Sequence, residues 1–435
     1  MYTLLIALLI SSVLPIVTNA QTDNDTEHYG RPSYWRPKDQ RGINVFETNK
    51  VADTIPFDGP RIRFGAGFTQ QFQNLKHETA TSTTLYKMGP GFNLAMANLF
   101  TDIQLADGIR LDVTTYLSTR HHNEAWVKGG YIQFDKLPFK GQFWSDLMDL
   151  VTIKIGHMEI NYGDQHFRRT DAGQALYNPF IENYIADAYS TEIGGEVYVQ
   201  KNGLFGMIGV TNGTINSSIA KQAADVERDS TKNPAFYAKV GIDKSISTRL
   251  RVRLAGSAYI NNKSQRNVLY GGDRGGSHYW GVMELDNASL ATSAFSGRFN
   301  PGFSRNIQAF MLNGFLKAGG FEFFGTFETA KGNAGTVADA TKRKMNQAAA
   351  EGVYRFGARE NVFVGARYNT VHAKLAGYTD NVEIDRLAFS AGWFLTRNIL
   401  LKGEYVNQEY EKFKVTDILN GGKFHGYVVE AVIGF

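Results

Sequence analysis

The chain has 435 residues and a formal net charge of +4, from 46 Lys and Arg against 42 Asp and Glu, and this near balance does not indicate a nucleic-acid-binding surface. It contains no cysteine, which excludes disulfides, thiolate metal sites and cysteine nucleophiles. Its mean hydropathy is −0.28, and no apolar run of about 18 residues follows residue 20, which excludes a spanning α-helix.

The composition instead suits a transmembrane β-barrel. The chain has 45 Gly, 21 Tyr and 30 Phe but only 10 Pro, as expected for many strands, tight turns and aromatic girdles. Such a barrel is polar on average because only every second strand residue meets lipid.

The first 20 residues are typical of a cleavable export signal. Leu4 to Val17 is mostly apolar but too short to span a bilayer, and the small residues Thr18 and Ala20 fit a cleavage site before Gln21. Residues 21–60 are polar, contain several prolines and lack periodicity. We therefore predict a signal peptide at 1–20 and a periplasmic N-terminal extension at 21–60.

From residue 61 to residue 435 the sequence alternates between apolar and polar or small residues. The segments 61–68, 108–114, 249–254 and 427–435 show this period most clearly. Successive strand residues face opposite sides, so each segment has one face for lipid and one for water. The predicted strands are 61–73, 91–105, 108–119, 125–136, 151–160, 191–200, 203–212, 234–245, 248–262, 304–318, 320–331, 345–357, 361–373, 382–396, 398–411 and 424–435.

Connection lengths predict sixteen strands in a closed antiparallel barrel. Bacterial barrels have short periplasmic turns and long extracellular loops, with an even number of strands. The two ends of the chain agree in register only if 263–303 is one long outer loop, with the apolar patch 277–287 folded back inside it. Eighteen strands is the alternative. The connection 137–150 is long for a periplasmic turn and has room for a short helix.

Three stretches resemble outer-membrane porins of the Bacteroidota, a group similar to the phosphate-selective porins O and P. They run from Asn161 to Asp171 and on through Tyr177-Asn178-Pro179-Phe180-Ile181, from Phe299 to Phe303, and from Phe321 to Thr326. The resemblance covers roughly residues 60–435. It implies a sixteen-stranded, trimeric, passive porin. The terminal Phe435 resembles the signal that the barrel-assembly machinery reads. Phosphate-selective members carry a long luminal arginine ladder, of which only part is present here.

In general porins the loop after strand five folds into the lumen, and here that loop is 161–190. It carries Arg168 and Arg169 together with Asp164 and Asp171. The arginine pair suits an anion-binding constriction because guanidinium offers forked donors. The alternative is that both arginines pair with Asp164 and Asp171 and only hold the loop in shape.

A second candidate is an arginine ladder at Arg249, Arg251 and Arg253, whose opposite face is apolar. An arginine facing lipid at mid-bilayer costs about 2–4 kcal/mol, so these side chains are expected in the lumen. The same alternation directs both basic and acidic residues inward. The basic set is Arg61, Arg63, Arg110, Lys154, Lys239, Arg355, Arg367 and Lys402, and the acidic set is Asp112, Glu351, Glu404 and Glu430.

The mixed but basic lumen favours an outer-membrane channel for small polar or anionic solutes, with weak anion preference. A phosphate- or oxyanion-specific porin is the alternative, and a barrel acting mainly as an adhesin, structural protein or enzyme is a third possibility. The expected partners are outer-membrane lipid, the solutes, the assembly machinery and two further copies in a homotrimer. No cofactor or catalytic residue is expected. No metal site is expected either, because nothing in the sequence supports the ligand number and geometry that His121-His122 with Glu124 would need.

Overall fold

Sequence alternation becomes a continuous ladder of antiparallel strands in the computed structural model of the chain. The structure describes residues 36–48, 50, 56–118, 125–213, 233–264, 266–272, 278–289 and 297–435. The predicted signal peptide and the His121-His122-Glu124 group lie outside these ranges.

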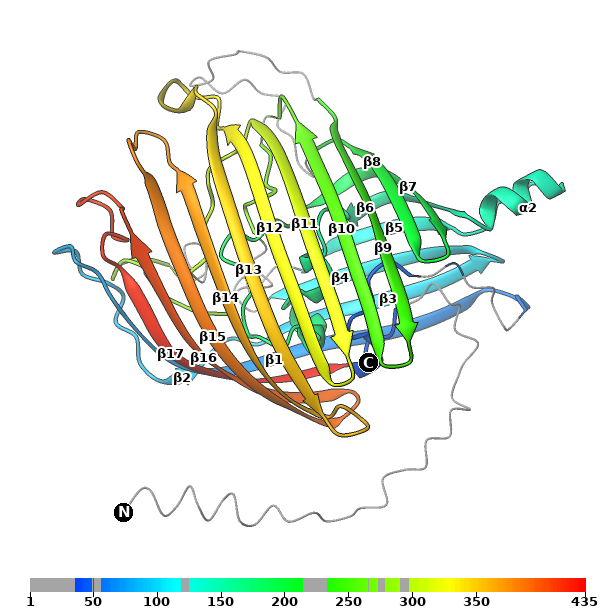
Figure 1. Cartoon of the computed structure of the whole chain (residues 1–435), viewed down its shortest axis with the longest axis horizontal. Helices are drawn as coiled ribbons and strands as arrows, with labels where there is room; N and C mark the ends of the chain where they lie inside the picture. Colours follow the sequence, from blue (N-terminus) through cyan, green and yellow to red (C-terminus); the bar gives the residue numbers. More distant parts are fainter. Residues whose placement is uncertain are drawn as a thin grey trace, which may run out of the picture.

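The strands surround a lumen, with shorter turns at the lower end in Figure 1 and longer loops at the upper end. Their bounds are β1 (Arg61–Glu78), β2 (Gly91–Phe92), β3 (Met96–Ala106), β4 (Ile109–Ser118), β5 (Ala125–Phe134), β6 (Val151–Glu159), β7 (Thr191–Lys201), β8 (Leu204–Thr211), β9 (Ala235–Ser247), β10 (Leu250–Asn261), β11 (Asn306–Ala318), β12 (Phe321–Asn333), β13 (Arg343–Phe356), β14 (Val362–Lys374), β15 (Asn381–Thr396), β16 (Ile399–Glu411) and β17 (Lys423–Gly434).

The barrel closes through its first strand. β1 pairs with β17 from Gly67↔Gly434 to Glu78↔Lys423 and with β3 from Arg61↔Gln104 to Thr69↔Met96. The two-residue β2 pairs with β1 just before β3 begins. In the described residues this gives sixteen long strands, and the predicted strand count is confirmed. Among the described strands, each long strand of the wall pairs with a neighbour on both sides, as a barrel that spans a membrane requires.

The two faces of the wall differ as the alternation predicts. On β10 the side chain of Leu254 is 50% exposed on the outside, whereas that of Arg253 is 2% exposed and lies inside. Apolar side chains cover the outer surface of the other strands in the same way, including Phe64, Val240, Phe310 and Phe389. This outer surface suits the hydrocarbon of a membrane.

The short turns obey the backbone preferences of glycine and asparagine. Asn202 and Gly203 join β7 to β8, and both have positive φ values, 53° and 80°. Such two-residue turns match the twist of the strands that they connect. The long connection between β5 and β6 contains the short helix α2 (Gln142–Met148), which confirms that prediction. Among the described residues, no helix is both long and apolar enough to cross a bilayer.

The patch at 277–287 forms no strand of the wall in its described part, which rules out the eighteen-strand alternative. Leu285 makes only an isolated bridge with Leu85, and the side chains from His278 to Val282 are buried. His278 donates its backbone N–H to Glu182 in the loop 160–190. The fold-back that the sequence predicted therefore enters the lumen and packs on another loop.

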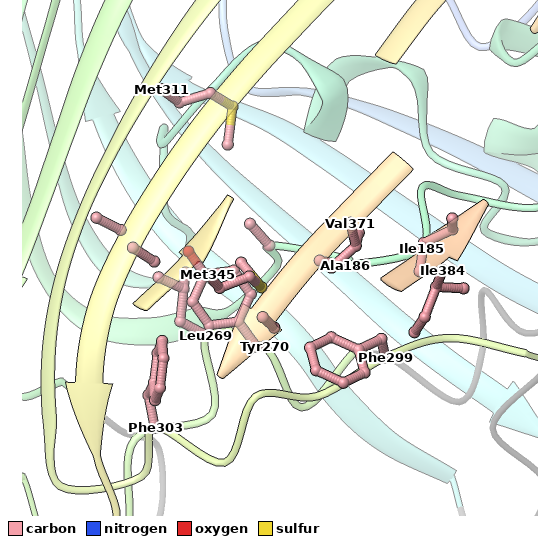
Figure 2. Packing of buried hydrophobic residues seen from close by; sticks show 14 of the residues in the cluster. Ile185, Ala186, Leu269, Tyr270, Phe299, Phe303, Met311, Met345, Val371 and Ile384 are labelled. Atoms are coloured by element: carbon pink, nitrogen blue, oxygen red, sulfur yellow. The ribbon is translucent and has the colours of Figure 1, made fainter. Parts of the chain in front are cut away.

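Both inward loops share an apolar core with the barrel wall. Ile185 and Ala186 come from the loop 160–190, and Leu269, Tyr270 and Phe299 come from the loop after β10. Figure 2 shows them beside side chains of β11, β13, β14 and β15, namely Met311, Met345, Val371 and Ile384. The core of this barrel thus lies inside it.

A third segment in the lumen was not foreseen. Residues 36–48 belong to the stretch that the sequence assigned to an extension outside the barrel, yet Asn44 and Phe46 are 4% and 2% exposed. The segment enters at the short-turn end, where the backbone N–H of Gln40 donates to the carbonyl of Arg397 at 2.8 Å. Nothing in its polar, aperiodic sequence signals this placement.

Candidate solute passage in the lumen

Cations of the strands β14 to β16 hold the backbone of the loop 160–190. Lys402 Nζ donates to the carbonyl oxygens of Ala175, Asn178 and Phe180 at 3.0, 2.9 and 2.8 Å. Arg367 and Arg386 donate to the carbonyl oxygens of Glu182 and Asn183, each at 2.7 Å. Irregular backbone needs such partners when it is buried. These inward cations therefore fix the loop against one side of the barrel.

The two arginines assigned to the constriction lie inside this packed loop. Arg168 pairs with Glu351 of β13 at 3.1 Å, and Arg169 pairs with Asp187 of the same loop at 2.6 Å. Their side chains are 5% and 2% exposed. The structure thus gives both arginines carboxylate partners, Glu351 of the wall and Asp187 of the loop, that the sequence did not predict.

Asp164 and Asp171 serve other cations. Asp164 binds Arg253 through two hydrogen bonds and Lys239 at 2.6 Å, whereas Asp171 pairs with Lys128 of β5. Burial alone would raise the pKa of Asp164, but Lys239 and Arg253 outweigh it and lower that pKa well below the ordinary value. Asp164 therefore stays charged and joins the loop to β9 and β10.

The predicted arginine ladder is only partly present. Arg249 lies in the exposed turn before β10, so it does not share a luminal face with the other two. The β9–β10 pairing shifts register between Leu250 and Arg251, which ends the regular alternation at that point. Arg251 binds Asp243 at 2.7 Å, and only Arg253 reaches the loop.

A cavity of about 210 Å³ remains between the loop and the opposite wall. Strands β1 and β3 to β7 form one side of it, and the loop together with the segment 36–48 forms the other. Its charged lining comprises the basic residues Arg36, Lys38, Arg63, Arg110, Lys128 and Lys154, the acidic residues Glu47, Asp102, Asp112, Glu159 and Glu196, and His166. The predicted inward side chains of Arg63, Arg110, Lys154 and Asp112 all meet here.

Several of these charges compensate one another. Arg63 pairs with Asp102, Lys128 pairs with Asp171, and Glu159 binds His166. Glu196 accepts hydrogen bonds from the Tyr198 and Tyr237 hydroxyls at 2.6 and 3.0 Å. By contrast, Lys38 and Lys154 make no ion pair or hydrogen bond with any residue that the structure describes. Lys38 Nζ lies 4.0 Å from the ring centroid of Phe100, and Lys154 Nζ lies 4.8 Å from that of Tyr198.

The cavity also offers an uncommitted amide. Asn98 of β3 is fully buried, yet neither its Oδ1 nor its Nδ2 has a hydrogen-bond partner in the described chain. A buried polar group is normally satisfied by protein or water, so this amide suits a hydrated cavity. The described residues contain no group of three or more His, Asp or Glu side chains placed to hold a metal ion.

Sequence reasoning found part of this site and missed the rest. Alternation placed Arg63, Arg110 and Lys154 in the lumen, although it did not single them out. Lys38 and Arg36 had no signal, because their segment lacks periodicity and lies before the first strand.

No protein-family model matches the chain, and no curated protein matches it in sequence. Solved structures that resemble it include three outer-membrane proteins. An anion-selective porin from Comamonas acidovorans has a TM-score of 0.54 at 10% identity, over 86% of this chain and 100% of that chain. The outer-membrane channel DcaP of Acinetobacter baumannii has a TM-score of 0.52 at 11% identity, over 87% and 98%. The trimer form of OmpT, an outer-membrane protein of Vibrio cholerae, has a TM-score of 0.52 at 11% identity, over 87% and 100%. At this identity the likeness shows a shared porin-like barrel fold.

Proposed function

We propose that the chain is an outer-membrane porin that lets small hydrophilic solutes diffuse through the cavity beside the loop 160–190. The observation that carries this proposal is the polar cavity itself, which lies within an apolar-coated, closed barrel. Charged side chains in a narrow lumen set which ions pass. The fold shared with solved porins and channels supports the same function.

The proposed channel prefers anions weakly. Two lysines lack an ion-pair partner, but Asp102 and Asp112 face Lys38, and Glu196 faces Lys154. Mixed charge of this kind lowers the preference below that of a continuous arginine ladder. The anion-selective porin of Comamonas acidovorans supports this direction. The alternative to this weak preference is a channel specific for phosphate, as in the porins O and P.

A planar-bilayer recording of the purified protein tests the proposal. In a potassium chloride gradient, the reversal potential should lie modestly on the anion side. Replacing chloride with phosphate then separates the two alternatives, because a specific porin would retain phosphate current at low concentration and lose chloride current in its presence. A folded barrel with no conductance would reject the channel and favour an adhesive or structural role.

We further propose a homotrimer in lipid, which the trimer form of OmpT supports. Chemical cross-linking of intact outer membranes should then give a band at three times the monomer mass. Cross-linking that yields only monomer at every reagent concentration would reject this assembly.

A further inference from the structure

We propose that the segment 36–48 is a built-in insert that completes the narrow part of the passage, and that its Lys38 is a specificity-determining residue for small anions. The inference rests on the proposed channel function, since it assigns a residue to that channel. It starts from the docking of the segment and then considers which of its charges reach the cavity.

Aromatic packing and hydrogen bonds hold the segment in the lumen. The ring of Phe46 packs edge-on against Phe167 of the loop and Phe315 of β11, at centroid distances of 5.7 and 5.5 Å. Asn44 donates to Glu322 of β12 at 2.7 Å. The Tyr177 hydroxyl donates to the carbonyl of Pro37 at 2.5 Å. The segment thus contacts the loop and two strands of the wall.

Glu47 fastens the far end of the segment. Its carboxylate lies 3.0 Å from Lys239 Nζ and 2.7 Å from Arg253 Nη2, in the same cluster as Asp164. Two cations, Lys239 and Arg253, therefore meet three carboxylates where the segment, the loop and the strands β9 and β10 come together, because Arg253 also pairs with Asp243 at 3.2 Å. Because these charges are buried, the loss of any one of them would leave its partner uncompensated, and this makes the cluster a firm anchor for the segment.

Lys38 is the charge that this docking leaves for the solute. Three charges of the cavity lining already have ion-pair partners. Arg63 and Asp102 pair with each other, and Glu47 pairs with Lys239, which lies outside the lining. Lys38 makes no hydrogen bond or ion pair with a described residue: the ring centroid of Phe100 lies 4.0 Å from its Nζ, and Asp102 and Asp112 are the carboxylates that act on its charge. Lys154 projects into the same cavity from β6. One cation from the insert and one from the wall thus attract small anions such as chloride or inorganic phosphate.

Gly42 provides a way to undock the segment without changing its charge. A Cβ atom at this position would lie 2.3 Å from the carbonyl oxygen of Pro37 and 2.6 Å from Cε1 of Tyr177. Neither neighbour can retreat easily, because the Tyr177 hydroxyl is bonded to that same carbonyl. Gly42→Ala should therefore displace the insert and carry Lys38 away from the cavity.

The test measures reversal potentials of the full-length protein in a potassium chloride gradient. Lys38→Gln and Lys154→Gln should each lower the chloride-to-potassium permeability ratio by about two- to tenfold, as expected for one charge in a narrow pore. Gly42→Ala should shift the ratio in the same direction and raise the conductance, because the insert leaves the passage. Lys136→Gln is the matched control, since Lys136 is an exposed cation that pairs with Asp107 on a turn.

Thiol chemistry gives a second readout, because the chain has no cysteine of its own. A Lys38→Cys variant should lose current when a negatively charged methanethiosulfonate reagent is added during recording, and Lys136→Cys should not. If Lys154→Gln shifts the ratio while Lys38→Gln and the labelled Lys38→Cys leave conduction unchanged, the insert lies outside the path and the channel function survives. If neither lysine matters in a conducting barrel, the inference is overturned. If the unmodified protein does not conduct, the proposed function itself fails.

Discussion

The guanidinium of Arg253 donates two hydrogen bonds to the carboxylate of Asp164, from Nε to Oδ2 at 2.7 Å and from Nη2 to Oδ1 at 2.8 Å. Both side chains are almost completely buried. One residue belongs to the barrel wall and the other to the inward loop, so this pair fixes the position of the loop relative to the wall. Forked bonds of this kind combine charge with a defined orientation.

Breaking this pair should destabilise the loop. Arg253→Gln leaves two buried carboxylates with less compensation, and the loss of one partner of a buried pair costs about 3–5 kcal/mol. The double variant Asp164→Asn/Arg253→Gln should recover part of that loss, because fewer uncompensated charges remain. The urea midpoint of the folded barrel in detergent measures both effects, and an Arg253→Gln variant as stable as the unmodified protein would contradict the assignment.

The arginine pair of the loop should act on stability more than on selectivity. Arg168→Gln/Arg169→Gln removes two cations that are bound to Glu351 and Asp187 and do not line the cavity. The double variant should therefore unfold at lower urea concentration, while its reversal potential should move less than that of Lys154→Gln. A larger shift in the double variant would restore the arginines as the constriction.

Docking of the segment 36–48 in the lumen should weaken at acidic pH. Burial alone would raise the pKa of Glu47, but Lys239 and Arg253 outweigh it and lower the pKa to about 2 from the ordinary 4.5. A lowered carboxylate pKa stabilises the docked state fully above the ordinary value and progressively less as the pH falls towards the docked value. Docking should therefore weaken between about pH 4.5 and pH 2.

Hydrogen exchange of residues 36–48, corrected for the intrinsic rate at each pH, measures this docking. Glu47→Gln is the control, because its side chain does not titrate in that window. The variant should exchange faster than the unmodified protein at pH 7, and the difference should shrink on acidification. A difference that stays constant from pH 7 to pH 2 would show that Glu47 does not anchor the segment.

Orientation in the membrane can be tested at the two ends of the barrel. Val337 and Val415 are 83% and 79% exposed in connections at the long-loop end, which makes both better insertion points than the buried Tyr270. An epitope tag after either valine should be detected on intact cells. A tag after Lys140, in the connection between β5 and β6, should be detected only after the outer membrane is permeabilised. The reverse pattern would invert the proposed topology.

Deletion of Phe435 should reduce the yield of folded barrel. Its backbone N–H donates to the carbonyl of Ala66 at 3.1 Å, and its own carbonyl accepts from the Ala66 N–H at 3.1 Å, so the residue extends the seam between β1 and β17. Its ring is 61% exposed on the barrel. Heat-modifiable migration measures the folded fraction, which should fall. Cell fractionation should then find unfolded chain in the periplasm. Normal yield of the truncated chain would show that the two backbone hydrogen bonds between Phe435 and Ala66 are not needed to close the seam.

The sequence by itself determined the wall of the barrel. Its alternation has the period of the strand pleat, and its connection lengths distinguish short turns from long loops, so local pattern was enough to predict sixteen strands. The same alternation placed Arg110, Lys154 and Arg253 on the inner face. It failed at Arg249 because a tight turn and a register shift interrupt the period there.

Only the tertiary structure decided which charges remain for a solute. Arg168 and Glu351 are 183 residues apart, and they meet because the closed wall brings β13 to the inward loop. The insertion of residues 36–48 depends in the same way on packing against Phe315 and on ion pairs with Lys239 and Arg253. Partners across a lumen are determined by barrel closure and loop path, and no local period encodes them. The net free energy of each buried ion pair depends on how deeply both charges are buried and where they lie relative to each other, and only the folded chain sets these two quantities.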